Sequence, residues 1–349
     1  MKRILFCFLI LIIGERAYSQ ISSCAQTLRL ARSTYEQGRL HELPALLESC
    51  LKNTGASGFT KEQKVQAYTL LAMAYIYLEE PEKADDAMLN LLRTDPYFRP
   101  NPDVDPAEFI GLFSTFRTRP IYRLGVKFGI NASQPNVSSY NPVSDGSAKY
   151  AYKIGIGGGV AAEVPINDKF TISAELFFLQ KKFTNTSSSI LQDTAYSSSV
   201  GTENQSWISL PLMVQYQLLD KRKIIPFVEG GISTDYLLGA TIDATQKRFG
   251  NQSSVDLKSF SITSQRQKIN VSAIIGAGFK TRIAGGYLLA DVRYSYGLIK
   301  SNTTATLSAN QDLLFDYKIV DGIFSMNSFY FNVGYVQNFF NPKKLKRKK

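Results

Sequence analysis

Histidine and cysteine are scarce in this chain of 349 residues, which contains one histidine and three cysteines. The single histidine is His41, so histidine-based catalytic triads and histidine-rich metal sites are excluded from the rest of the chain. No internal apolar run of about 18 residues occurs, and no membrane-spanning helix is therefore expected. These absences predict a protein that is not an enzyme, with no catalytic, cofactor-binding or metal-binding residues and no small-molecule substrate.

Positive charge exceeds negative charge, giving a formal net charge of +11, and six of the last seven residues are lysine or arginine. These lysines and arginines form a short terminal tail, residues 343–349, without interleaved aromatic residues, so no nucleic-acid partner is expected. The tail is expected to be solvated or to contact an anionic lipid or polymer. At the other end, Lys2 and Arg3 precede a ten-residue apolar stretch, and residues 1–19 predict a signal peptide.

Two cysteines remain after removal of the signal peptide, which contains Cys7. An exported chain meets an oxidising compartment, and a disulfide between Cys24 and Cys50 is therefore predicted. Two buried thiols are the alternative. Lipidation of Cys24 also stays open, although Glu15 and Arg16 separate its vague lipoprotein-box sequence from the apolar stretch.

Residues 20–118 have apolar residues at helical spacing and predict a small helical domain. Thr60 and Gln63 form a capping-box sequence, and Glu80 with Pro81 interrupts the pattern that follows. Seven positions resemble those of a tetratricopeptide repeat, namely Tyr68, Leu71, Ala72, Tyr75, Ala84, Met88 and Pro96. That resemblance implies a protein-binding module, and a plain helical bundle is the alternative.

Two further segments complete this helical region. A weaker copy of the repeat precedes residue 60 and contains Gly38 and Leu47 at matching offsets. After the stronger copy, Asp105, Pro106 and Glu108 predict a final helix that begins with a capping box.

From residue 121 the apolar period changes from helical spacing to two. Eight strand segments are predicted, at 121–134, 150–166, 170–183, 205–219, 224–239, 267–282, 286–300 and 328–340. Short and long connections alternate between them, as in an outer-membrane barrel with tight periplasmic turns and long external loops. An even number of strands returns the C-terminus to the side of the helical domain, so both are expected in the periplasm.

One face of each predicted strand is apolar, and the other contains glycine, charged and polar residues. In the sixth segment Ile269, Val271 and Ile275 alternate with Lys268 and Asn270. The interior of an eight-stranded barrel holds only modest side chains, so the bulky apolar face is predicted to contact lipid. A soluble, lipocalin-like barrel with the two faces reversed is the alternative.

Charged residues on the inward face are predicted to pair inside the barrel, because an unpaired buried charge costs several kcal/mol. Four bases and four acids form this predicted network: Arg123, Lys127, Glu163, Glu175, Glu229, Lys280, Asp291 and Arg293. Lys153 and Lys268 are expected nearer the external mouth of the barrel. The pairing predicts a plug inside the barrel, and a transport pore is disfavoured because eight strands leave no open channel.

Two neighbouring strands carry a family resemblance. Residues Leu210, Pro211, Leu212 and Tyr216, followed by Pro226, Phe227 and Gly230, resemble the PorT-like outer-membrane β-barrel family of Bacteroidota over residues 121–340. Gln215 and Phe227 replace the lysine and tyrosine usual in that family. The resemblance implies an outer-membrane location and, for some members, a role in type IX secretion or gliding.

The predicted fold class is α + β with two domains, a small tetratricopeptide-like helical domain followed by an eight-stranded antiparallel transmembrane barrel. The domains are residues 1–19 (signal peptide), 20–118 (periplasmic helical domain), 119–342 (outer-membrane barrel) and 343–349 (basic tail). Outer-membrane lipid and a periplasmic or envelope protein are the expected partners. The predicted function is an accessory of secretion or envelope assembly, and a surface receptor or adhesin acting through long external loops is the alternative.

Overall fold

The chain folds into two compact units. One unit consists of Pro120–Phe339, and the other consists of the residues before and after that range. The computed structural model describes residues 23–53, 55, 57–139, 149–191, 195–219, 224–249, 254–283, 285–306, 309–317, 319 and 321–345. The predicted signal peptide lies outside these described residues. Within them, no helix is both long enough and apolar enough to cross a membrane.

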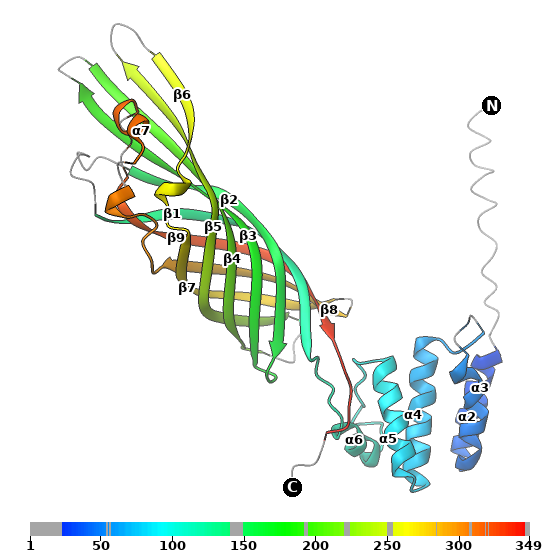
Figure 1. Ribbon diagram of the computed structural model, residues 1–349. Coiled ribbons are helices and arrows are strands. Elements are labelled where there is room, and N and C mark those ends of the chain that lie inside the picture. Colours follow the sequence, from blue (N-terminus) through cyan, green and yellow to red (C-terminus); the bar gives the residue numbers. More distant parts are fainter. Residues whose placement is uncertain are drawn as a thin grey trace, which may run out of the picture. The chain divides into compact units, whose positions relative to one another are not determined.

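The first unit is a helical bundle (Figure 1). Its elements are α2 (Ser23–Glu36), η1 (Leu40–Glu42), α3 (Leu43–Lys52), α4 (Lys61–Tyr77), α5 (Pro81–Thr94) and α6 (Ala107–Ser114). The predicted capping box is confirmed, because the Gln63 N–H donates to the Thr60 hydroxyl at 3.3 Å and the Thr60 N–H donates to Gln63 Oε1 at 3.0 Å. Proline at the first turn of α5 separates it from α4, as the interrupted pattern predicted.

The start of α6 differs from its prediction. Its N-cap is Pro106 and no side chain caps the helix, so the capping box predicted for Asp105, Pro106 and Glu108 is wrong. The Asp105 carboxylate instead accepts a hydrogen bond from the Asn101 N–H at 2.6 Å. The preceding turn therefore uses the carboxylate that would otherwise have capped the helix.

The helical unit has an apolar core to which all its α-helices contribute, including the fully buried Leu47, Met88 and Phe109. Cys24 and Cys50 border this core and are joined by a disulfide, with their Cα atoms 5.7 Å apart. The disulfide links α2 to α3 across a sequence separation of 26 residues.

The C-terminal segment belongs to the helical unit, which includes the chain from Phe340 onwards. Lys344 forms an antiparallel bridge with Phe116, and the Leu345 N–H donates to the Thr115 carbonyl at 2.8 Å. The Lys344 ammonium also pairs with the Asp85 carboxylate of α5. The described residues of the tail, 343–345, are exposed as expected, but main-chain hydrogen bonds and an ion pair also attach them to the helical unit.

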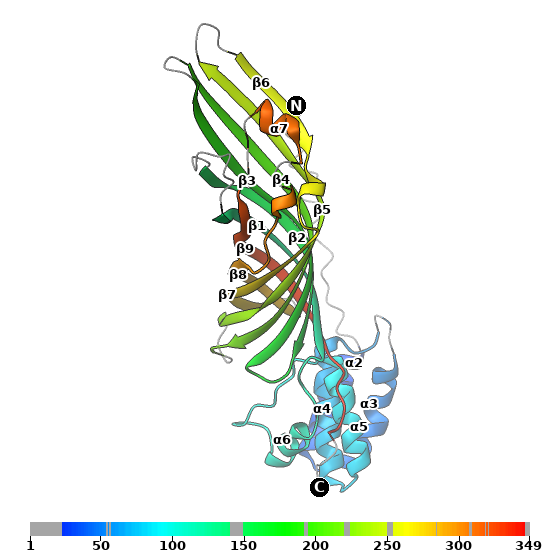
Figure 2. The same ribbon diagram turned by 60° about the vertical axis from the view of Figure 1, so that its left-hand side comes forward.

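The second unit is a closed antiparallel ring of eight strands (Figures 1 and 2). Its strands are β1 (Tyr122–Ser139), β2 (Lys149–Pro165), β3 (Phe170–Leu191), β4 (Ala195–Gln217), β5 (Ile224–Phe249), β7 (Ile269–Ile283), β8 (Gly286–Gly297) and β9 (Ile323–Phe339). Pairing of β9 with β1 and of β4 with β5 closes the ring. The predicted number of barrel strands is confirmed.

A ninth strand, β6 (Ser254–Ser261), lies outside the ring, where a long loop over residues 240–266 was predicted. It pairs with the outer part of β5. The predicted loop over residues 184–204 is also mostly strand, because β3 and β4 continue to pair as far as Leu191 and Ala195. These segments are rich in serine and threonine, and apolar alternation is limited to short series such as Ala240, Ile242 and Ala244.

Together β3, β4, β5 and β6 form a sheet that continues beyond the ring (Figure 2), here called the outer extension. An apolar cluster packs against it. Its residues are Phe177, Leu179, Trp207, Leu237, Ala240, Ile242, Ala244, Phe260, Ile262, Leu313, Tyr317 and Ile319. Because the last three come from α7 (Gln311–Phe315) and the segment after it, the connection between β8 and β9 covers this end of the barrel interior.

The two faces of the ring have opposite chemistry. Outward residues are apolar and exposed, for example Phe128 and Ile156, whereas the inward Lys127 and Glu163 are fully buried. The ring therefore presents an apolar outer surface and a charged interior, as the strand alternation predicted.

Candidate functional site

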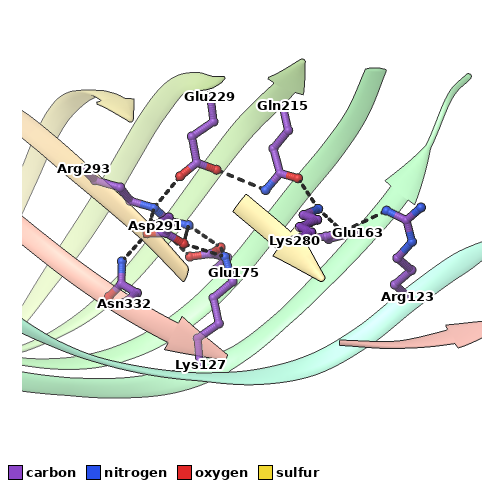
Figure 3. Close-up of polar contacts among 10 residues, drawn as sticks. All are labelled: Arg123, Lys127, Glu163, Glu175, Gln215, Glu229, Lys280, Asp291, Arg293 and Asn332. Carbon is purple, nitrogen blue, oxygen red and sulfur yellow. Dashed lines mark hydrogen bonds and ion pairs between the residues drawn. The ribbon is translucent and has the colours of Figure 1, made fainter. Parts of the chain in front are cut away.

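Arg293 contacts three carboxylates inside the barrel (Figure 3). Its guanidinium contacts Glu175 at 2.7 Å, Glu229 at 2.7 Å and Asp291 at 2.9 Å. Lys127 approaches the same acids, at 2.5 Å from Glu175 and 3.4 Å from Asp291. Two cations and three carboxylates from β1, β3, β5 and β8 thus neutralise most of one another's charge in the buried interior.

A second group is centred on Glu163 of β2. Its carboxylate contacts the Lys280 ammonium at 2.8 Å and the Arg123 guanidinium at 3.1 Å. Arg123 also donates to Asn338 Oδ1 at 2.9 Å. The surplus positive charge here balances the surplus negative charge around Arg293.

Gln215 connects the two groups. Its amide nitrogen donates to Glu229 at 3.1 Å, and its amide oxygen accepts from Lys280 at 2.6 Å. The structure therefore brings all eight predicted charged residues into one buried network, here called the lumen network (Figure 3). The sequence prediction omitted Gln215, because only charged residues were assigned to the network.

Glycines opposite the long side chains make this arrangement possible. Lys127 lies directly between Gly159 of β2 and Gly334 of β9 in the strand register. A Cβ atom on Gly334 would lie 2.6 Å from Cγ of Lys127, closer than two non-bonded carbon atoms can approach. The glycines on neighbouring strands thus leave the space through which lysine crosses the interior.

A further buried ion pair was not predicted. The Lys181 ammonium lies 2.9 Å from the Asp235 carboxylate, which also accepts hydrogen bonds from Ser209 and Ser233. Lys181 lies an even number of residues from Glu175, and Asp235 lies an even number from Glu229, so each pair shares one face of its strand. The alternation used for the prediction, extended by a few residues, would therefore have found both.

A third buried cluster joins the barrel to its covering segments. Arg266 contacts Glu203 at 2.5 Å and Asp321 at 2.6 Å. Burial by itself would lower the pKa of Arg266, but the two carboxylates raise it above the ordinary value, so the guanidinium stays charged. All three residues lie in predicted loops, where strand parity offers no signal.

Lys153 was predicted to face into the external mouth of the barrel, but its side chain faces outward. The pairing of β2 with β3 shifts between Lys153 and Gly157, and the Lys153 ammonium donates to Thr202 Oγ1 at 3.4 Å. Thr202 lies on the outward face, because it alternates with the buried, inward Glu203. The irregularity in β2 therefore turns Lys153 outward.

A small cavity lies inside the barrel. A cavity of about 20 Å³ lies between Glu175 and Asp235, with Ser209, Ser272 and Arg293 also in its wall. This volume suits about one water molecule. Among the described residues, no three histidine, cysteine, aspartate or glutamate side chains are grouped so that they could hold a metal ion.

A protein-family model matches more than half of the chain. Residues 118–302 match the family described as "Outer membrane protein beta-barrel domain". Among solved structures, Neisserial surface protein A is 12% identical, with a TM-score of 0.29, and the match covers 62% of this chain and 97% of that one. OprG from Pseudomonas aeruginosa is 12% identical, with a TM-score of 0.34 and coverage of 64% and 98%.

A third similar structure is the attachment invasion locus protein Ail of Yersinia pestis, in complex with the heparin analogue sucrose octasulfate. It is 10% identical, with a TM-score of 0.27, and the match covers 62% of this chain and 98% of that one. None of the curated proteins matches the chain.

Proposed function

The chain belongs to the outer membrane protein β-barrel domain family, and from this premise we propose that its barrel is a closed anchor for a protein-binding helical unit in the periplasm. The observation that carries the proposal is the lumen network, in which eight buried charges pair across the interior. A barrel filled in this way offers no path for a hydrated solute. Its use is to hold other parts of the chain at the membrane.

The proposed orientation follows from the connections between strands. The chain leaves the helical unit to begin β1 and re-enters it after β9, at the barrel end where β2–β3 and β7–β8 are joined by short turns. Outer-membrane barrels have their short turns on the periplasmic side. In this orientation the helical unit is periplasmic, and the outer extension faces the cell exterior.

Cysteine labelling of intact cells tests the orientation. A cysteine in place of the exposed Leu257 of β6 should react with a membrane-impermeant maleimide, and one in place of Lys169 in the β2–β3 turn should not. The disulfide of Cys24 and Cys50 keeps the background low. Labelling only at position 169 would reverse the proposed orientation.

We further propose that the helical unit binds protein in the manner of tetratricopeptide repeats. Its two helix pairs, α2 with α3 and α4 with α5, are followed by α6, which supplies Phe109 to the shared core. Large side chains stay exposed on it, notably Leu30 and Tyr77, each with about half of its surface accessible (53% and 52%). The partner proposed for this unit is a component of secretion or envelope assembly.

Photo-crosslinking in cells tests this partner. A photoreactive amino acid at Leu30 or Tyr77 should capture a discrete periplasmic or envelope protein, whereas the same probe at the lipid-facing Ile156 should not. Capture only from positions in the outer extension would contradict the anchoring role.

A second candidate function is a surface receptor or adhesin. The outer extension favours it, because β3 to β6 and α7 form a packed apolar cluster instead of loose loops. A probe at Leu257, which is 71% exposed, samples this surface. Crosslinks from position 257 to external molecules would support the receptor role.

Planar-bilayer recording tests the closed barrel directly. Purified full-length protein should give no steady conductance, because the lumen network and the apolar cluster above it fill the interior. A steady open channel would contradict the proposed plug.

A further inference from the structure

The outward face of the ring changes from apolar to polar near the outer extension. On β1 the apolar series reaches Ile130 and Ala132 and is followed by Gln134, and on β9 Phe329 is followed by Asn327. In the strand register Ala132 pairs with Phe329, and Gln134 pairs with Asn327. Since the family places the ring in the outer membrane, this boundary marks the level where hydrocarbon gives way to lipid headgroups.

A groove of about 560 Å³ lies at this boundary. Ala132 is the small residue among its aromatic neighbours Tyr152, Tyr294 and Phe329, and the last two have ring centroids 4.7 Å apart. Polar amides also line it, namely Gln134, Asn136 and Asn327. One part of the groove is therefore apolar, and the part toward the outer extension can form hydrogen bonds.

Two lysines lie beside the groove at the same level. Lys153, the neighbour of Tyr152, pairs directly with Lys182 on β3. Like charges placed opposite each other on neighbouring strands are destabilising unless an anion compensates them. Within the described part of the chain no carboxylate forms an ion pair with either lysine.

One acid on this face, Asp243, lies directly opposite Thr202 in the strand register, so a single carboxylate accompanies the two lysines. Asp243 is on β5, two strands from Lys182, and accepts a hydrogen bond from the Asn204 amide at 3.4 Å. The Lys153 ammonium reaches over β3 to Thr202, so both ammonium groups lie on the same outward surface. The lysine pair thus keeps a net positive charge at the headgroup level.

We propose that this surface is a binding site for a membrane lipid that carries a phosphate, with its phosphate on Lys153 and Lys182 and an acyl chain in the groove over Ala132. A phosphate monoester suits the lysine pair because it offers several acceptor oxygens and up to two negative charges. The groove suits hydrocarbon because small and aromatic side chains line its apolar part. The site requires the membrane barrel alone and is independent of what the helical unit binds.

Lipid retention by the full-length protein tests the site. The protein is reconstituted in phosphatidylcholine vesicles doped with bis-phosphorylated lipid A, extracted in mild detergent, and assayed for bound lipid A. Substitution K153Q/K182Q should lower the apparent affinity about twenty-five-fold, since each lysine contributes a factor of about five. Substitution K169Q/K247Q removes the same charge from exposed positions away from the groove and should change the affinity little.

The acyl part of the site has its own variant. Ala132→Leu fills the groove without changing charge and should weaken lipid A binding about tenfold, the equivalent of roughly two buried methylene groups. Ala290→Leu adds the same side chain on the outward face of β8, outside the residues that line the groove, and serves as the matched control.

Three outcomes would overturn the proposal. The first is equal retention of lipid A by K153Q/K182Q and the unaltered protein. The second is equal binding of lipid A from which both phosphates have been removed. The third is full displacement of lipid A by inorganic phosphate at matched concentration, which would assign the lysines to a free anion. Retention of phosphatidylglycerol as well as lipid A would support a phosphate-lipid site and widen its range.

Discussion

The two units of this chain have opposite interiors. The helical unit encloses apolar side chains such as Leu47 and Met88. The barrel, in contrast, encloses the ion pairs of the lumen network, such as Lys127 with Glu175. Their surfaces are reversed in the same way, since the ring exposes Phe128 and Ile156. The surrounding solvent explains the difference, because water drives apolar groups inward and lipid accepts them on the outside.

The same difference predicts how each unit fails. In the helical unit, loss of a core contact removes hydrophobic stabilisation and leaves a cavity. In the barrel, loss of one charged partner leaves the other charge buried without compensation. Substitutions of similar size should therefore have different costs in the two units.

The largest effect is expected from Glu175→Ala. It leaves Lys127 and Arg293 without their shared acid and should destabilise the barrel by about 3–5 kcal/mol, provided that water stays out. Urea unfolding of the barrel in detergent measures the change, and Glu108→Ala on the exposed surface of α6 is the control. Unchanged heat resistance of folded Glu175→Ala on gels would show that the network is not a structural plug.

Reduction of the disulfide should come next. Opening the link between Cys24 and Cys50 should destabilise the helical unit by about 3.5 kcal/mol in the chain-entropy model for a closed loop of 26 residues. Limited proteolysis with and without reductant detects the loss, and the barrel should keep its heat resistance. Two free thiols in protein from native envelopes would contradict the disulfide.

A smaller effect is expected from Thr60→Ala. It removes the hydroxyl that accepts from the Gln63 N–H at the start of α4 and should cost about 1 kcal/mol. Thermal unfolding of the helical unit, followed by circular dichroism, reports the change. Thr60→Ser keeps the hydroxyl and should behave almost as the unaltered protein does.

The smallest effect is expected from Asp312→Asn. Its ion pair with Lys258 lies on the outer extension, where the two side chains are 57% and 55% exposed, so the loss should stay within about 0.5 kcal/mol. Measured beside Glu175→Ala in the same urea series, it separates the effect of burial from that of charge. Equal costs for the two substitutions would refute the role assigned to burial.

Much of the lumen network could be predicted from the sequence, because strand parity assigns each residue of a regular strand to one face. Glu163, Glu175 and Lys280 were placed inward on that basis, and the structure brings them into contact with basic or acidic partners. Parity failed at Lys153, where an irregularity in β2 turns the side chain outward. A bulge of this kind depends on both neighbouring strands and leaves no mark on one strand's alternation.

The outer extension could not be predicted in the same way. Ser187 pairs with Ser199, and Asp243 with Ser259, so long parts of these strands lack the apolar alternation that marks a strand. The docking of Lys344 beside Phe116 was missed for a related reason, since a basic terminal sequence is typical of a solvated tail.

By itself, the sequence determined the eight-stranded ring, the outward apolar face and the residues whose charges had to be paired, because each depends on local alternation and on the cost of burying charge. Only the tertiary structure decided which charges meet, through Gln215 and the shared position of Arg293. It also decided that β6 pairs with β5 and that the chain end joins the helical unit. The charge contacts join residues far apart in the sequence, and their geometry exists only once the ring has closed.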